Sequence, residues 1–138
     1  MFDITTQAVN DTATIHIKGA DGELLYADAD RTLPCEIVIY GPGSKAFGLL
    51  EARQSARVIK RMQENDGKIT VAPFEERARE TAEDLASITV AFNNFDYPPA
   101  GDAQGVELFT ALYSAPRLGF IPRQVTKHLG DWGNFRAA

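Results

Sequence analysis

The spacing of the apolar residues changes once along this chain, at Ser44, and that change constrains the fold more than any other feature. Between positions 12 and 18, Ala13, Ile15 and Ile17 alternate with polar residues, which is typical of a half-buried β-strand. After Ser44 the apolar residues recur about every 3.6 positions, which is the period of an amphipathic helix. A chain that places its strands first and its helices afterwards predicts an α+β fold rather than alternating βαβ units.

The first part of the chain is expected to form three strands, over Thr12–Lys18, Leu24–Tyr26 and Cys35–Tyr40. Asp21-Gly22 separates the first two strands, and this dipeptide favours a tight hairpin turn because both positions tolerate a positive φ. Because the connections are short, we predict an N-terminal three-stranded antiparallel β-meander. A parallel arrangement of Cys35–Tyr40 with both of its neighbours would contradict this prediction.

The rest of the chain is expected to form about four α-helices. Ser44 is a good N-cap for the first helix, which we expect to pack on two neighbours because its apolar side chains form a broad stripe. The stripe is formed by Leu49, Ala52, Ala56 and Ile59, and is widened by Phe47, Leu50, Val58 and Met62. Pro73 begins the second helix. Its expected buried face consists of Phe74, Ala78, Ala82 and Leu85.

Two structures remain open for Ser87–Phe95, because the helix could continue or its β-branched residues could end it. Pro98 and Pro99 stop any helix, after which Asp102 can cap a short third helix. A fourth helix is expected from about Gly119. The inward residues of these two helices are expected to be Val106, Phe109 and Leu112, and Ile121, Val125, Leu129 and Trp132. We expect residues 1–138 to form a single domain, β-rich over 1–42 and helical over 43–138.

The charge of the chain argues against a nucleic-acid partner. The formal net charge is −5 and the pI is about 5.0, whereas nucleic-acid binding needs a clustered excess of Lys and Arg. Cys35 is the only cysteine, which favours a reducing compartment. The first residues lack the pattern of a signal peptide, and no apolar run approaches the roughly 18 residues of a membrane span. We therefore expect a cytosolic protein with no nucleic-acid or membrane contacts.

The glycines of the loop after Cys35–Tyr40 raise the question of a phosphate site. Gly41, Gly43 and Ala46 fit the G-x-G-x-x-G/A spacing of dinucleotide-binding loops. That motif should open a βαβ unit, and the short segment 68–71 is the only following run that could supply its parallel strand. We favour a tight corner in which Ser44 caps the helix, and we predict that residues 41–44 bind no phosphate.

Other catalytic or metal-binding patterns are weak. His16 and His128 stand alone, without the paired histidines, cysteines or carboxylates that hold a metal. Cys35 begins an apolar strand and is expected to be a small buried side chain rather than a nucleophile. We expect no cofactor, no metal and no enzymatic activity.

Two groups of residues are candidates for contacts with other proteins. Arg53, Arg57, Lys60 and Arg61 form a basic stripe on the first helix of an otherwise acidic chain. This stripe is either a solvated face or a docking surface for an acidic partner or for the acidic second helix of a neighbouring subunit. The second group is Trp132 and Phe135 near the end of the chain, because aromatic residues are favoured anchors at interfaces.

Taken as a whole, the chain resembles the tail assembly chaperones of long-tailed bacteriophages. The resemblance runs from the junction "IVIYGPGSKAF" through an Ala- and Arg-rich helix to an acidic helix that ends in "LASITVAF". It continues through a Pro-containing loop to "ELFTALYSAPRLGFIPRQVTKHLGDWGNF", so that it spans roughly Glu36 to Phe135.

This resemblance implies a non-enzymatic protein that binds the tape measure protein, keeps it soluble and helps to recruit tail tube subunits. It also implies self-association, action in the host cytoplasm and absence from the finished particle. The alternative is a structural component of the particle, such as a tail terminator or connector, which would share the size, acidity and α+β build. A nucleotide-binding protein or enzyme is a third class, and it depends on the Gly41 loop alone.

Overall fold

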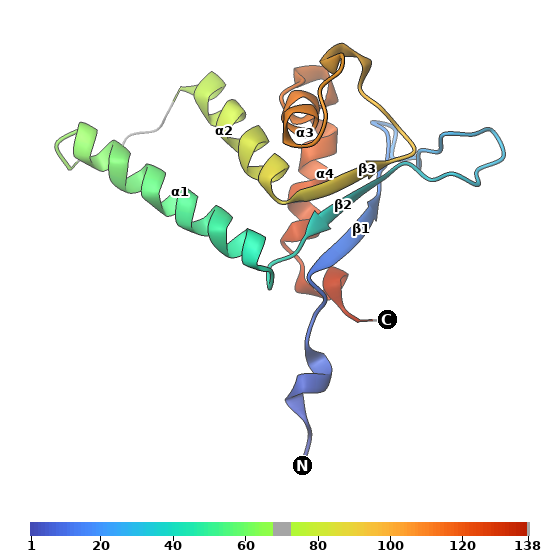
Figure 1. Ribbon diagram of the computed structural model, residues 1–138, viewed down its shortest axis with the longest axis horizontal. Helices are drawn as coiled ribbons and strands as arrows, with labels where there is room; N and C mark the ends of the chain where they lie inside the picture. The colour runs from blue at the N-terminus through green and yellow to red at the C-terminus, as the bar shows by residue number, and fades with distance from the viewer. Residues whose placement is uncertain (68–72, 138) are drawn as a thin grey trace.

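The computed structural model describes residues 1–67 and 73–137, which form an α+β fold with one antiparallel sheet (Figure 1). Within these residues there are three strands, ordered β1-β2-β3 in the sheet, with both pairs antiparallel. The strands are β1 (Thr12–His16), β2 (Glu36–Tyr40) and β3 (Thr89–Asn93). The four α-helices are α1 (Lys45–Glu64), α2 (Phe74–Ser87), α3 (Val106–Tyr113) and α4 (Phe120–Leu129). The expected fold class is therefore confirmed, and β2 runs antiparallel to both of its neighbours.

The third strand comes from a different part of the chain than expected. Leu24 and Tyr26 form only isolated bridges, with Lys18 and Pro34, while residues 18–34 project from the end of the β1–β2 pair (Figure 1). The third strand is β3, which lies inside the part of the chain expected to be helical and resolves the open question about Ser87–Phe95. The β-branched residues after Ser87 end α2. Phe92 and Thr89 of β3 then lie opposite Ile37 and Ile39 of β2, which places the inner face of β3 against the core.

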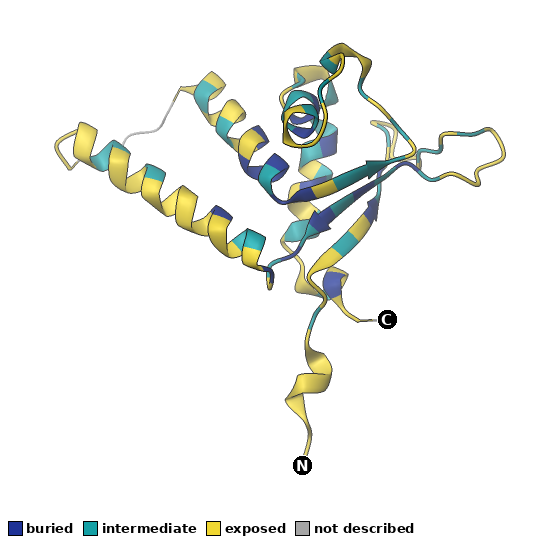
Figure 2. Cartoon of the chain, viewed as in Figure 1, coloured by how far each residue is buried: buried dark blue, intermediate teal, exposed yellow. Residues whose placement is uncertain are grey.

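One face of the sheet and three helices form the core. Ile15 lies opposite Ile37, and Ile37 lies opposite Phe92, so one face of all three strands is apolar. Helices α2, α3 and α4 contribute buried side chains to the same cluster as this face (Figure 2). Their buried apolar residues are Ala82, Leu85 and Ala86, then Phe109, Leu112 and Tyr113, and finally Ile121 and Val125.

The helices bury less of their apolar surface than the sequence suggests. Ala82 and Leu85 of α2 are buried as expected, but Phe74 and Ala78 are exposed because they line an open groove beside the start of α4. Val106 is exposed at the start of α3, whose N-cap is Gly105 with φ +61° rather than Asp102. None of the helices in the described ranges is long and apolar enough to cross a membrane.

Helix α1 differs from the other helices because it leaves the core after its first turn and a half. Ser44 caps it as predicted, with the Phe47 N–H donating to Ser44 Oγ at 3.2 Å. Of its 20 residues only Leu50 is buried. Figure 2 shows a mostly exposed rod beside α2. The expectation that α1 packs on two neighbours is therefore wrong.

Candidate functional site

Helix α1 is attached to α2 by charged side chains rather than by apolar packing. Arg57 grips the carboxylate of Asp84 through two hydrogen bonds, from Nη2 to Oδ1 at 2.6 Å and from Nη1 to Oδ2 at 2.8 Å. Arg53 donates to Ser87 Oγ at 2.8 Å and lies 3.4 Å from Asp84 Oδ1. Gln54 adds a third donor to Asp84 at 3.2 Å. A carboxylate at the base of α2 is thus held by three side chains of α1.

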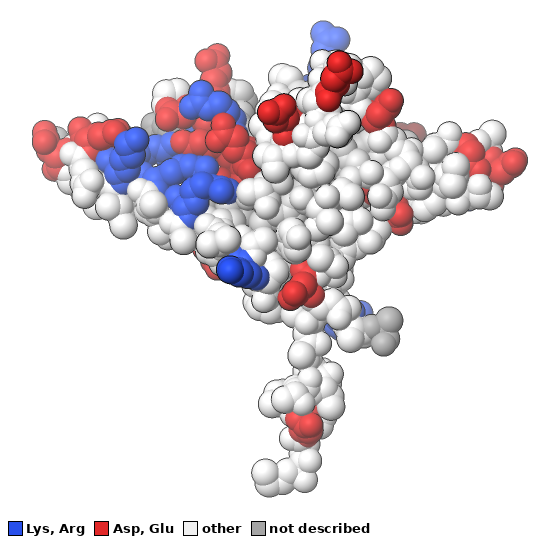
Figure 3. All heavy atoms as spheres, in the orientation of Figure 1, with Lys and Arg blue, Asp and Glu red and all other residues white. Residues whose placement is uncertain are grey.

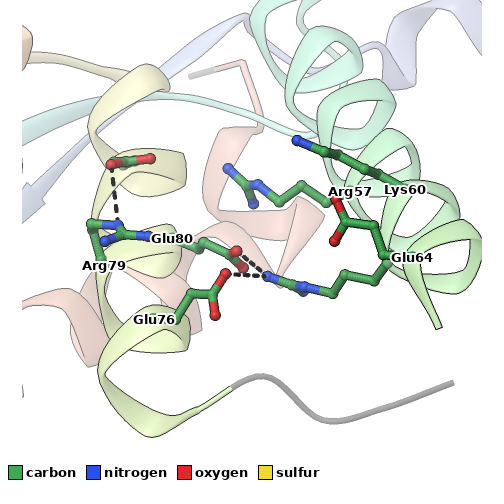
Figure 4. A pocket seen from close by; sticks show the side chains of 8 residues that line it. Arg57, Lys60, Glu64, Glu76, Arg79 and Glu80 are labelled. Carbon is green, nitrogen blue, oxygen red and sulfur yellow. Dashed lines mark hydrogen bonds and ion pairs between the residues drawn. The ribbon is translucent and has the colours of Figure 1, made fainter.

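The same attachment continues toward the C-terminal end of α1 and the N-terminal end of α2. Arg61 contacts Glu80, and its Nη2 lies 3.6 Å from Glu76 Oε1 (Figure 4). We call the whole set the α1–α2 clasp, which consists of Arg53, Arg57 and Arg61 with Asp84, Glu80 and Glu76. Figure 3 shows the resulting patch, where basic side chains of α1 lie directly beside acidic side chains of α2.

The buried end of the clasp is the stronger one. Burial by itself raises the pKa of Asp84, but the hydrogen bonds from Arg57 and Gln54 and the charges of Arg57 and Arg53 outweigh it and lower that pKa below its ordinary value. The hydrogen bonds with Asp84 likewise raise the pKa of Arg57. Because Asp84 is buried while Arg53 and Glu76 are well exposed to solvent, most of the stabilisation comes from the Arg57–Asp84 pair.

Most of the predicted basic stripe forms ion pairs inside the chain. Arg53, Arg57 and Arg61 pair with the acidic helix of their own chain, not with a neighbouring subunit, and among the described residues only Lys60 of the stripe makes no ion pair. The physical reason is a matched period. Arginines at positions 53, 57 and 61 and acids at positions 76, 80 and 84 are each one turn apart, so two adjacent antiparallel helices bring them into register.

Pairing on one side leaves the opposite side of α1 uncovered. The stripe that the sequence places in the core, Leu49, Ala52, Ala56 and Ile59, is exposed along its whole length. Leu49 is 61% exposed and Ile59 is 56% exposed. Their spacing of three and four residues puts all four side chains on one face, with the two alanines between the larger residues. We call this surface the α1 stripe.

Basic side chains border the α1 stripe. Lys45 lies one turn before Leu49, and Lys60 lies one turn after Ala56. Both lysines are exposed and neither makes an ion pair among the described residues. The stripe therefore combines apolar contact area with a nearby positive charge on each end.

The two predicted aromatic anchors have different environments. Phe135 is 1% exposed, and its ring packs on Gly41 and edge-on to His128, so its prediction as a surface anchor is wrong. The backbone explains this burial, because Phe135 accepts a hydrogen bond from Asn10 at 2.7 Å and so ties the end of the chain beside β1. Trp132 lies beyond the end of α4, at the start of the short 3₁₀ segment Trp132–Phe135, and is 56% exposed, so the expectation that it continues the inward face of the fourth helix is wrong. Its role as an interface anchor stays a prediction.

The glycine loop is a tight corner. The N–H of Gly41 donates to Asp11 O at 2.7 Å, and both the N–H and the Oγ of Ser44 donate to Gly41 O, at 3.1 and 2.7 Å. These donors are therefore used inside the protein, and Ser44 is buried. The antiparallel neighbours of β2 lack the βαβ arrangement that a dinucleotide loop requires, and the suggested partner segment 68–71 lies outside the described residues.

Comparison with known proteins adds no family to this picture. The chain matches no protein-family model, no curated protein sequence and no solved structure. In the part of the chain that the structure describes, no group of three or more His, Cys, Asp or Glu side chains could hold a metal ion. The α1 stripe is thus the surface on which a functional hypothesis can be built, and sequence periodicity located its residues but assigned them to the core.

Proposed function

We propose that this protein is a tail assembly chaperone of a long-tailed bacteriophage, which binds the tape measure protein in the host cytoplasm. In this role it keeps its client soluble, helps to recruit tail tube subunits and is absent from the finished particle. The observation that carries the proposal is the exposed α1 stripe on a helix that projects beside the core. The family resemblance of residues 36–135 supports the same role.

The shape of the α1 stripe fits an amphipathic helix as client. A helix presents apolar anchors at spacings of three and four residues, and Leu49, Ala52, Ala56 and Ile59 repeat that spacing. Ala52 and Ala56 have small side chains, so a second helix can approach closely between the larger Leu49 and Ile59. A long helical protein with uncovered apolar stripes would aggregate on its own, and covering those stripes would keep it soluble.

The charges beside the stripe indicate which kind of helix is preferred. Lys45 and Lys60 favour a client whose apolar face is bordered by Asp or Glu. The same charges disfavour pairing of two α1 helices through their stripes, because an antiparallel pair that sets Leu49 against Ile59 brings Lys45 of one copy within about one turn of Lys60 of the other. The α1 stripe is therefore assigned to the client and not to self-association.

The test is a co-expression experiment with a tape measure protein as client. Ile59→Asp places a charge in the α1 stripe and should move most of the client into the insoluble fraction. Val58→Asp is a matched control, because Val58 is a neighbouring β-branched residue that is 50% exposed on a different face of the same helix. Val58→Asp should leave client solubility unchanged. Equal behaviour of the two variants would contradict the assignment of the stripe.

Particle composition separates this function from its alternative. A chaperone should be missing when purified phage particles are analysed by mass spectrometry, whereas a tail terminator or connector should be present in a fixed copy number. Detection of the chain at a fixed stoichiometry in the particle would overturn the proposed function, whatever the outcome of the solubility experiment.

A further inference from the structure

Residues 1–8 form an arm that carries apolar side chains away from the body of the protein (Figure 1). All eight residues are exposed, and Phe2 and Ile4 are 72% and 71% exposed. The arm is nevertheless structured, because Asp3 caps the short segment Ile4–Gln7 by accepting from the Thr5 N–H at 3.0 Å and from its hydroxyl at 2.7 Å. In Figure 3 the arm shows one acidic side chain and no Lys or Arg.

A separate apolar groove of about 610 Å³ lies between the first half of α2 and the start of α4. Its apolar lining includes Phe74 and Ala78 from α2 and Pro116 and Pro122 beside and within α4. The groove explains why Phe74 and Ala78 are exposed although the sequence pattern predicts a buried face there. Its volume lies within the about 300–1,000 Å³ that is typical of ligand pockets.

The charges of the arm and the groove are complementary. The charged residues that line the groove are Arg123 and Lys127, both basic and both exposed. The only charged side chain among residues 1–10 is Asp3, which lies between Phe2 and Ile4. A chain segment with two large apolar side chains around one carboxylate is thus matched to an apolar groove with a basic wall.

We propose that the arm of one copy docks in the α2–α4 groove of a second copy. Phe2 and Ile4 fill the apolar part of the groove, and Asp3 faces Arg123 and Lys127. This interface is independent of the proposed chaperone function, because it uses neither the α1 stripe nor the client. It also differs from the surfaces that the sequence suggested, because it uses neither the basic stripe of α1 nor Trp132 and Phe135.

The arm and the groove are different surfaces, so the contact between copies is head-to-tail. Such a contact leaves a free arm and a free groove on every dimer, and it therefore propagates into a ring if the rotation closes or into a filament if it does not. The contact uses only three side chains of the arm, so assembly should depend on protein concentration.

A mixing experiment tests this geometry directly. The double variant Phe2→Ser with Ile4→Ser keeps the groove but loses the arm contacts, and Ala78→Glu keeps the arm but places a bulky acid in the groove. In sedimentation velocity the wild type should form species larger than a dimer, and each variant alone should be monomeric. An equimolar mixture should produce a one-to-one dimer and nothing larger, because only one productive contact can form.

Controls keep the outcome interpretable. Leu33→Ser removes an exposed large apolar residue elsewhere and should assemble like the wild type, and circular dichroism should show all variants folded. A wild type that stays monomeric, an arm variant that still assembles, or a mixture without the dimer would each overturn the proposal. If Ala78→Glu abolishes client solubility but leaves assembly intact, the groove binds the client and the proposal is wrong.

Discussion

Replacement of Gly41 by alanine should strongly destabilise the protein, because the ring of Phe135 packs against Gly41 and leaves no room for a Cβ. A Cβ at position 41 would lie 2.4 Å from Cδ2 and 2.6 Å from Cε2 of the Phe135 ring. Gly41 does not have a positive φ, so the backbone itself would accept alanine. The effect of Gly41→Ala is therefore steric, and its size depends on whether the ring can move.

The ring has little room to move. Favourable contacts between carbon atoms are about 3.5–4.0 Å long, so the ring would have to retreat by about 1 Å. Phe135 is among the largest fully buried side chains, and its movement would displace the core around it. Overpacking of this kind costs about 1–3 kcal/mol, and we expect Gly41→Ala to lower the free energy of unfolding by about 2–3 kcal/mol.

Urea denaturation followed by far-ultraviolet circular dichroism measures this loss, and two other glycines are matched controls. At Gly43 an added Cβ would have ordinary contacts, at 3.4 Å to Val9 and 3.5 Å to Trp132, so Gly43→Ala should be nearly neutral. Gly48 lies inside α1 with nothing within 4 Å of an added Cβ, so Gly48→Ala should stabilise by about 0.5–1 kcal/mol.

A double variant tests the cause. In Gly41→Ala combined with Phe135→Leu the ring is absent, so the added Cβ meets no clash. The double variant should therefore lose less free energy of unfolding than the two single variants lose in total. Additive losses, or a Gly41→Ala variant within about 0.5 kcal/mol of the wild type, would refute the steric explanation.

Two further predictions follow from ionisable groups. Asp84→Asn should lower the free energy of unfolding by about 1–3 kcal/mol near neutral pH. The pKa of Asp84 is lowered from 3.8 in the folded protein, so its carboxylate stabilises the fold above pH 3.8 and this stabilisation is lost as the pH falls through the lowered pKa. In acid denaturation the stabilities of Asp84→Asn and the wild type should therefore converge below pH 3.8. Burial raises the pKa of Tyr113 to about 12, although its hydrogen bond with Thr89 partly opposes this. Stability should therefore fall as the pH rises above 10, and an absorbance titration should show one tyrosine ionising near pH 12 that Tyr113→Phe removes.

Local sequence patterns predicted most of the elements. The alternation around Ile15 and the apolar run of β2 gave two strands in the right place, and Ser44 correctly marked the start of α1. These predictions succeeded because strand alternation and helix capping depend on near neighbours in the chain. The third strand was predicted wrongly at Leu24–Tyr26, and Ser87–Phe95 was left open, because a segment as short as Thr89–Asn93 has no periodicity that separates the end of a helix from a strand.

The sequence alone determined which residues share a face, and the tertiary structure decided what covers each face. Period and charge spacing placed Leu49 with Ile59 and Arg57 with Arg61, but the same spacing fits the acidic helix of the same chain and that of a neighbouring subunit equally well. In the folded chain α2 takes the basic side of α1, since a buried carboxylate at Asp84 needs charged donors, and the apolar side is left exposed. Phe135 is buried for a similar reason, because the end of the chain pairs beside β1 and Gly41 leaves room for a ring that no local pattern could reveal.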